Sequence, residues 1–340
     1  MSDHHTSRLH DAPLQAATSR HEAMMAEARR IIDAGNERDV ILRLTGGLAV
    51  RHYAIDLEFA ERAYSDIDLI GLKRQTIEIH QVFLDLRYQE NIHVAMATGN
   101  SQRQYFRPQH ALESRAHMPK RAHATPVMSA VPPSDHIDVF LDAMKMDHEL
   151  DFRDRLEINT YAVDPADIFL SKLQIVNLSE KDAHDVITLC KDVYVDFHPH
   201  PGVLDLEHVA ETCAGDWGLY IDVMSNIDKV LERLDDYDLS PMETNRIART
   251  LELAQDMMTE HSKSLRWRMR ARVGKRLRWY NEVDETFGGR TEETAAAVRT
   301  KEGRAAQQAA TDEAAGQDPA DAGGEGASGD GRSAGEVPGA

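Results

Sequence analysis

The chain has few of the residues that mark secreted, metal-cluster or membrane proteins. Its 340 residues include only two cysteines, Cys190 and Cys213, too few for a disulfide framework or a cysteine-based zinc site. No apolar run is long enough to cross a bilayer, and the His- and Asp-containing N-terminus does not resemble a signal peptide. We therefore expect a cytoplasmic protein without a membrane-spanning segment.

Positive charge is also scarce. The chain has 39 Lys and Arg against 58 Asp and Glu, which gives a formal net charge of −19. This balance argues against a protein that coats nucleic acid or an anionic membrane non-specifically. It does not exclude a local basic patch, and one is present late in the chain.

Composition and periodicity divide the chain into four parts. In residues 1–16 the apolar residues follow neither a helical nor a strand-like spacing, which predicts a loose leader. Residues 17–200 alternate between strand-like and helix-like segments. Residues 201–287 are mostly helical in period, and residues 288–340 hold almost no large apolar side chain, which predicts a disordered acidic tail. We expect an α/β (α+β) domain, a short mixed sheet flanked by helices, followed by an α-helical C-terminal region.

Individual elements of the first domain follow from apolar spacing. Strands are expected at residues 40–44, 66–70, 92–95, 104–106, 137–140 and 159–163. Helices are expected at residues 18–34 and 76–86, from Pro165 onward, and at 180–194. Residues 110–126 predict an exposed loop.

The most informative stretch runs from residue 44 to residue 69. Gly46 and Gly47 follow Thr45 at the end of an expected strand, and Asp66 and Asp68 alternate with apolar residues in the next strand. Successive side chains of a strand point to opposite faces, so the two aspartates share one face. Two carboxylates a few Å apart repel each other unless a cation lies between them, which predicts a divalent metal.

A third acid and a lysine extend this pattern. Asp138 lies inside the apolar strand at residues 137–140, and Lys172 lies inside an otherwise apolar helix. Phosphoryl-type transfer requires metal ions held between carboxylates, together with donors that hold a triphosphate. The glycine pair and the helix start after it can offer backbone N–H groups to phosphate oxygens. Asp138 would complete a second metal site and orient or deprotonate the attacking hydroxyl, and Lys172 would neutralise phosphate charge.

Together these segments resemble the nucleotidyltransferase fold of the DNA polymerase β superfamily. TGGLAVRHY, RAYSDIDL and IDVF are similar to its signature of a glycine pair, an Asp-x-Asp and a third carboxylate on a later strand. They look closest to bacterial stand-alone enzymes related to abortive-infection toxins, in which an Arg commonly precedes the Ser/Thr-Asp-Ile-Asp-Leu motif, as Arg62 does here. The resemblance covers roughly residues 38–195, and the His- and Arg-rich stretch at residues 91–134 departs from it.

This resemblance implies a Mg²⁺-dependent transferase that moves a nucleoside monophosphate from an NTP, such as ATP, to an acceptor hydroxyl. The catalytic and metal-binding residues would be Asp66, Asp68 and Asp138, and the nucleotide-binding residues would be Thr45, Gly46, Gly47, Ser65 and Lys172. Lys181, Asp182 and Asp185 match a later motif of the family. The acceptor stays open between tRNA, a protein side chain and a small molecule such as an aminoglycoside. An antitoxin would be the protein partner.

Two interpretations from other classes fit the same residues. The chain could be a catalytically silent relative that binds nucleotide or protein, or a regulatory, antitoxin-like protein that works through its acidic tail. Four histidines suggest a metal site, but their irregular spacing on a predicted loop favours scattered surface side chains: His110, His117, His123 and His136.

The basic patch begins at Lys263 and ends at Arg278. It holds eight Lys or Arg and no acid, interleaved with Trp267 and followed by Trp279. Apolar residues recur there at helical spacing and predict a helix over residues 262–280, packed by its apolar stripe and with its cations paired to acids: Leu265, Met269, Val273, Leu277 and Tyr280. The alternative is an electrostatic platform for an RNA such as a tRNA acceptor stem.

Overall fold

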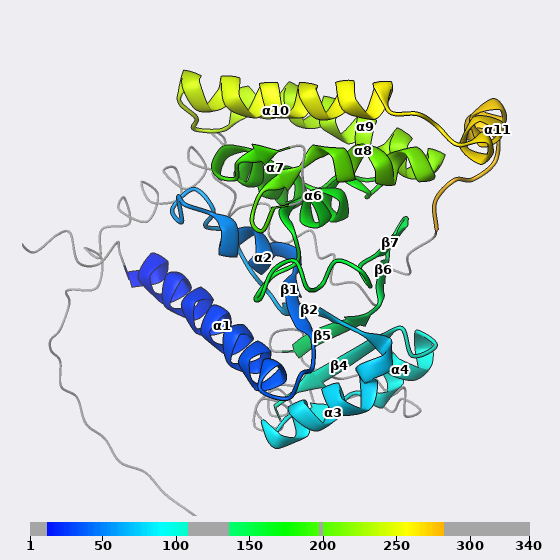
Figure 1. The fold of residues 1–340 in the computed structure, drawn as a ribbon. Helices are drawn as coiled ribbons and strands as arrows, with labels where there is room; N and C mark the ends of the chain where they lie inside the picture. The colour runs from blue at the N-terminus through cyan, green and yellow to red at the C-terminus, as the bar shows by residue number, and fades with distance from the viewer. Residues whose placement is uncertain (1–11, 108–135, 197–199, 282–340) are drawn as a thin grey trace, which may run out of the picture.

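The structure is a computed structural model that describes residues 12–107, 136–196 and 200–281. These residues form a mixed α/β fold with one five-stranded mixed sheet and many helices, which confirms the expected α+β class (Figure 1). The expected loop at residues 110–126, the acidic tail and most of the leader lie outside the described residues. No helix in the described ranges has the length and apolarity that crossing a bilayer requires.

The sheet has the strand order β1-β2-β5-β4-β3. Its members are β1 (Leu42–Thr45), β2 (Ile67–Gly71), β5 (His136–Leu141), β4 (Gln102–Phe106) and β3 (Gln89–Glu90). β2 and β5 run parallel, and every other neighbouring pair is antiparallel. The parallel pair brings residues 66–71 and 136–141 side by side although about 70 residues separate them in sequence.

Helices cover the sheet on the side of its apolar residues. α1 (Ala12–Asn36) begins six residues before the expected helix start and packs on β1 and on α3 (Thr76–Asp85). α3 follows the short η1 (Lys73–Gln75), and α4 (Ile92–Ala97) packs on β4. α2 (Gly46–Tyr53) starts directly where β1 ends, contacts β2, and continues toward the helices α6 and α7.

The remaining described elements are mainly helical and lie above the sheet in Figure 1. The helices are α6 (Pro165–Leu173), α7 (Glu180–Asp192), α8 (Leu206–Gly215), α9 (Trp217–Arg233) and α10 (Pro241–Glu260), with η2 (Leu234–Asp236) after α9. Two small sheets join them: β6 (Ala143–Lys145) with β7 (Glu149–Asp151), and β8 (Val195–Asp196) with β9 (Leu204–Asp205).

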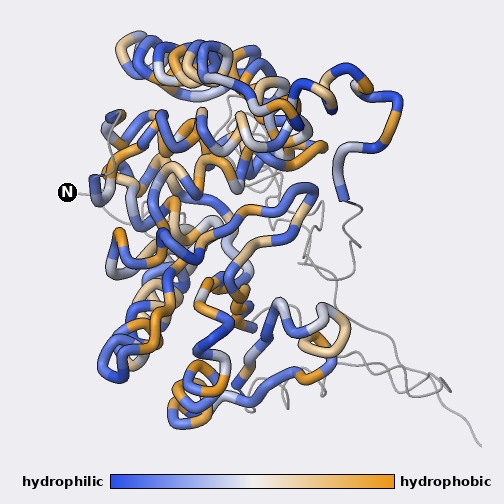
Figure 2. The backbone as a smooth tube through the Cα atoms, turned by 45° about the vertical axis from the view of Figure 1, so that its right-hand side comes forward, coloured by the Kyte–Doolittle hydropathy of each residue, from blue (hydrophilic) through white to orange (hydrophobic). Residues whose placement is uncertain are grey.

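Side-chain caps explain where these helices start. Asp164 accepts a hydrogen bond from Ala166 N before Pro165 opens α6, as the sequence predicts. Ser240 and Glu243 form a reciprocal capping box at α10. The helices alternate between hydrophilic and hydrophobic residues in Figure 2, and their buried faces join the sheet in one continuous hydrophobic core.

Two expected strands are absent from the described structure. Residues 92–95 form α4 instead, because the Asn91 side chain caps the helix start by accepting from His93 N. Within residues 159–163 only an isolated bridge forms, between Ala162 and Leu44. The expected strand at residues 104–106 is confirmed as part of β4.

The basic patch also differs from its expectation. α11 (Leu265–Val273) is followed by the short η3 (Gly274–Arg276), because Gly274 leaves the helix with φ of 60°. α11 has no buried residue, and its apolar stripe faces solvent; Leu265 is 67% exposed and Leu277 is 63% exposed. α11 lies at the right of Figure 1 and contacts α9 through Trp267 and Arg270, but its apolar stripe is exposed, so the predicted packing of this stripe is wrong.

Candidate metal and nucleotide site

A row of four polar side chains crosses the sheet where β1 ends. The strand register pairs Thr45 with Asp68, Asp68 with Asp138, and Asp138 with Gln104. Residues paired across neighbouring strands point to the same face of a sheet. Asp68 and Asp138 therefore face the same side, as the alternation of polar and apolar residues in each strand predicts.

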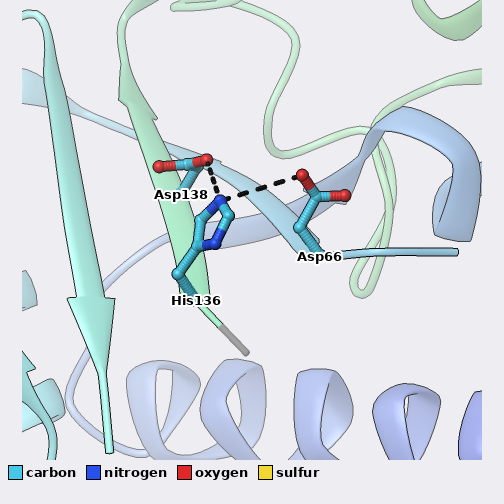
Figure 3. Close-up of side chains that lie close together, drawn as sticks. All are labelled: Asp66, His136 and Asp138. Atoms are coloured by element: carbon cyan, nitrogen blue, oxygen red, sulfur yellow. Dashed lines mark ion pairs between the residues drawn. The ribbon is translucent and has the colours of Figure 1, made fainter. Parts of the chain in front are cut away.

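Beside this row, three potential metal ligands meet. One ligand atom from each of Asp66, His136 and Asp138 lies within 4.8 Å of the other two. His136 Nε2 lies 3.1 Å from Asp138 Oδ2 and 3.9 Å from Asp66 Oδ2, between the two carboxylates (Figure 3). His136 is the first residue of β5, one position before the Ile137 that pairs with Ile67 of β2.

Burial and the charges of the neighbouring acids determine the protonation of this cluster. Burial, then the negative charges of Asp66 and Asp138, raise the pKa of Asp68 well above its ordinary value. Burial lowers the pKa of His136, but the hydrogen bond and charge of Asp138 outweigh it, so the pKa of His136 is raised. The site therefore favours a positive charge among its carboxylates, and a divalent cation would supply one.

The glycine pair lies directly beside Asp68. Gly46 has φ of 66°, and a Cβ there would lie 2.3 Å from Asp68 Oδ2. A Cβ on Gly47 would lie 1.9 Å from Arg62 Nη2. Neither position can carry a side chain without displacing a charged group, which explains the need for glycine at both.

The start of α2 has polar groups without partners. Thr45 is its N-cap residue, but no side chain caps the first turn of this helix. Thr45 Oγ1 is fully buried, and no hydrogen-bond partner for it exists in the described part of the chain. Backbone N–H groups at a helix start and a buried hydroxyl are suitable donors for phosphate oxygens. This arrangement fits a phosphate group bound between α2 and a metal at Asp68.

The cations predicted near the phosphates form a buried network with acids. Arg62 donates two hydrogen bonds of 2.8 Å to Asp185, and Lys172 lies 2.8 Å from Asp185 and 3.2 Å from Asp182. Burial raises the pKa of Asp185, but the charges of Arg62 and then Lys172 outweigh it and hold the pKa at about 2. Lys172 thus pairs with Asp182 and Asp185, and Arg62 links this network to Gly47.

Ser65 and a pocket complete the surroundings. The exposed Ser65 donates a 2.8 Å hydrogen bond from Oγ to Asp66 Oδ1. Asp66 and His136 also line an open pocket of about 200 Å³, which is lined as well by α1 residues and by Tyr88 and Arg107. This volume is below the usual range for a whole drug-sized ligand, so it suits one part of a larger substrate.

The structure brings most of the predicted residues together, places Lys172 in the ion-pair network with Asp182 and Asp185, and adds one residue to the site. Thr45, Gly46, Ser65 and the three predicted aspartates border a single site, and Gly47 contacts it through Arg62. His136 was expected to be a surface histidine and instead has a side chain that is only 16% exposed, at the centre of the carboxylates. The signal was present in the sequence, because His136 and Asp138 are two residues apart on a strand and so share a face.

Searches of protein-family models, of curated proteins and of solved structures each found no match to this chain.

Proposed function

We propose that this chain is a Mg²⁺-dependent nucleotidyltransferase with the nucleotidyltransferase fold, acting as in the toxin-type enzymes its motifs resemble. The observation that carries the proposal is the position of the Asp68 carboxylate against Gly46 and beside Asp138, the residue with which Asp68 pairs in β5. A phosphate bound at the start of α2 and a carboxylate at the same point repel each other unless a metal joins them. An NTP–Mg²⁺ complex satisfies both groups.

Each part of the site has a role in this reaction. Thr45, Gly46 and Gly47 would hold the triphosphate oxygens, and Asp66 and Asp68 would hold the metal that bridges them. Asp66 and Asp138 would hold a second metal near the acceptor. When bound, the metals would partly neutralise the negative charge of the triphosphate and of the attacking oxygen.

Residues of the chain itself would accept the proton of the acceptor hydroxyl and orient the acceptor. The acceptor oxygen forms a bond to the α-phosphorus of the NTP while the bond from that phosphorus to the β-phosphate oxygen breaks. Pyrophosphate leaves, and Asp138 would take the acceptor proton; a hydrogen bond of 3.0 Å from Gln104 Nε2 to Oδ1 holds this carboxylate in place. Positioning and charge stabilisation, rather than a covalent intermediate with the enzyme, then account for the reaction.

An RNA acceptor, such as a tRNA acceptor stem, is favoured by the basic arm, defined as residues 263–278. Four of its exposed guanidinium groups have no carboxylate partner among the described residues: Arg266, Arg268, Arg272 and Arg276. The arm is anchored at both ends, since Lys263 Nζ donates to the carbonyls that end α10 and Trp279 Nε1 donates to Asp222 Oδ2 at 2.8 Å. Unpaired cations on an otherwise acidic protein suit a polyanion.

Pyrophosphate release tests the proposal. Wild-type protein given NTP, Mg²⁺ and a cell extract should release pyrophosphate, and Asp66→Asn should abolish the release while its thermal unfolding stays cooperative. Glu149→Gln, which removes an exposed carboxylate from β7, is the matched control and should leave turnover unchanged. An NTP-dependent thermal shift without pyrophosphate in any extract would instead favour a silent nucleotide-binding module.

A further inference from the structure

Hydrogen bonds fix the two carboxylates that face His136. Gln104 Nε2 donates to Asp138 Oδ1 at 3.0 Å, and Ser65 Oγ donates to Asp66 Oδ1 at 2.8 Å. In both aspartates the other oxygen, Oδ2, is the one that faces the His136 ring. In metal sites, hydrogen-bond donors commonly hold one oxygen of a carboxylate ligand and leave the other oxygen free to bind the metal.

The distances between these atoms fit one octahedral metal. Ligands about 2.1 Å from a metal and at right angles to each other lie about 3 Å apart, and opposite ligands lie about 4.2 Å apart. His136 Nε2 lies 3.1 Å and 3.9 Å from the two Oδ2 atoms, and all three atoms lie within 4.8 Å of one another. Small side-chain movements would bring them to the three corners of one coordination face.

A ligand set of one imidazole and two carboxylates differs from an all-oxygen site. Mg²⁺ prefers oxygen ligands, whereas imidazole nitrogen suits divalent transition metals such as Mn²⁺, Fe²⁺ and Zn²⁺. We propose that Asp66, His136 and Asp138 form a mixed nitrogen–oxygen metal site that prefers a divalent transition metal over Mg²⁺. Only the role of the bound metal, as the second metal beside the acceptor, rests on the proposed function.

A competing role for His136 makes the opposite prediction. If the ring serves only as a positive counter-charge to Asp138, it occupies the place of the metal, and removing it should strengthen metal binding. If the ring is a ligand, removing it should weaken the binding of transition metals and leave Mg²⁺ binding nearly unchanged. His136→Gln separates these roles, because glutamine keeps a polar side chain of similar reach without imidazole nitrogen.

Mn²⁺ alone is the probe, added to the full chain and followed by electron paramagnetic resonance. Titration gives the affinity for Mn²⁺, competition gives the affinity for Mg²⁺, and electron spin echo modulation detects a directly bound ¹⁴N nucleus. Wild type should bind Mn²⁺ at least about tenfold more tightly than Mg²⁺ and show ¹⁴N modulation. His136→Gln should lose that modulation and at least about tenfold in Mn²⁺ affinity.

A control histidine away from the site also contacts a carboxylate and has a similar exposure. His208 Nε2 lies 3.0 Å from Asp167 Oδ1 and its side chain is 19% exposed, close to the 16% of His136. His208→Gln should keep both the modulation and the affinity. The proposal is overturned if wild type shows no ¹⁴N modulation, a result that needs no variant to fold, or if His136→Gln binds Mn²⁺ as tightly as wild type. Wild type that binds Mn²⁺ through nitrogen but transfers no nucleotide would contradict the proposed function and leave this site standing.

Discussion

Gly46 and Asp68 are in contact at the end of the β1–β2 pair, so closely that a Cβ on residue 46 would lie 2.3 Å from Asp68 Oδ2. The start of α2 and the central carboxylate of the site are therefore one structural unit. A substitution at either residue should therefore alter both the proposed phosphate-binding site at the start of α2 and the proposed metal site.

Gly46→Ala should abolish nucleotide binding. The substitution combines a left-handed backbone, at φ of 66°, with a displaced Asp68 carboxylate. Gly99→Ala is the matched control, because Gly99 has φ of 61° but no atom within 4 Å of its Cβ position. Both variants should lose about 1–2 kcal/mol of stability through the backbone. Isothermal titration with Mg²⁺–NTP should detect binding to Gly99→Ala only, and equal binding to both variants would contradict the assignment.

Thr45→Val should raise stability while it weakens nucleotide binding. The hydroxyl is buried and has no hydrogen-bond partner in the part of the chain that the structure describes, and such a group costs about 1–3 kcal/mol of folding free energy. Thr188→Val is the contrasting control, because Thr188 Oγ1 donates to His184 O at 2.8 Å and its loss should destabilise the protein. Urea unfolding and NTP titration measure the two effects. Unchanged NTP affinity in Thr45→Val would show that the hydroxyl does not bind the ligand.

Asp185→Asn should destabilise the fold by about 3–5 kcal/mol, because it leaves Arg62 and Lys172 buried with less compensating charge. The pKa of Asp185 is held at about 2 in the folded protein, below the ordinary value of about 3.9. The ion pairs therefore stabilise the fold fully above about pH 4, and this contribution is lost as the pH falls toward 2.

Denaturant unfolding from pH 2 to pH 7 checks this sign. The difference in free energy of unfolding between wild type and Asp185→Asn should be largest above about pH 4 and should shrink toward pH 2. Asp85→Asn, which removes an exposed partner of Arg38, should change stability little at any pH. A difference between wild type and Asp185→Asn that stays constant with pH would contradict the proposed ion-pair contribution.

Charge reversal in the basic arm should weaken RNA binding without unfolding the protein. Arg268→Glu with Arg272→Glu alters two exposed guanidinium groups that have no carboxylate partner within residues 12–107, 136–196 and 200–281. If each contacts a phosphate, the slope of log affinity against log salt should fall by about 0.7–0.9 for each lost contact. Lys73→Glu with Arg74→Glu reverses two exposed cations in η1 and serves as the control. Filter binding with total tRNA measures both variants, and equal losses would mean that no specific surface is involved.

The local geometry of the site was accessible from the sequence, because it depends on short-range rules. The period of two placed Asp68 on the polar face of β2, with Asp66 directly before this strand, and Gly46-Gly47 marked the point where β1 ends and α2 begins. The parallel pairing of β2 with β5 was not accessible in this way, because it joins segments about 70 residues apart. His136 was therefore expected on the surface, because its contact with Asp66 lies across that pair.

The predictions of secondary structure and packing were wrong where a single local interaction outweighed the composition or periodicity of the sequence. Residues 92–95 have strand-like composition, but the cap at Asn91 and the short span before β4 favour α4. In the basic arm, the apolar spacing continues through Leu277, but Gly274 ends the helix and the stripe faces solvent. Periodicity shows which residues share a helix face and not whether another element covers that face.

The most direct test of nucleotidyl transfer follows the label from the NTP. Wild type and Asp66→Asn are incubated with each NTP labelled at the α- or the γ-phosphate, with Mg²⁺ and total cell extract, and the RNA, protein and small-molecule fractions are separated. The account predicts that wild type transfers α-label, and not γ-label, into the RNA fraction, and that Asp66→Asn transfers neither. Transfer of γ-label, or α-label transfer that survives in a folded Asp66→Asn variant, would contradict it.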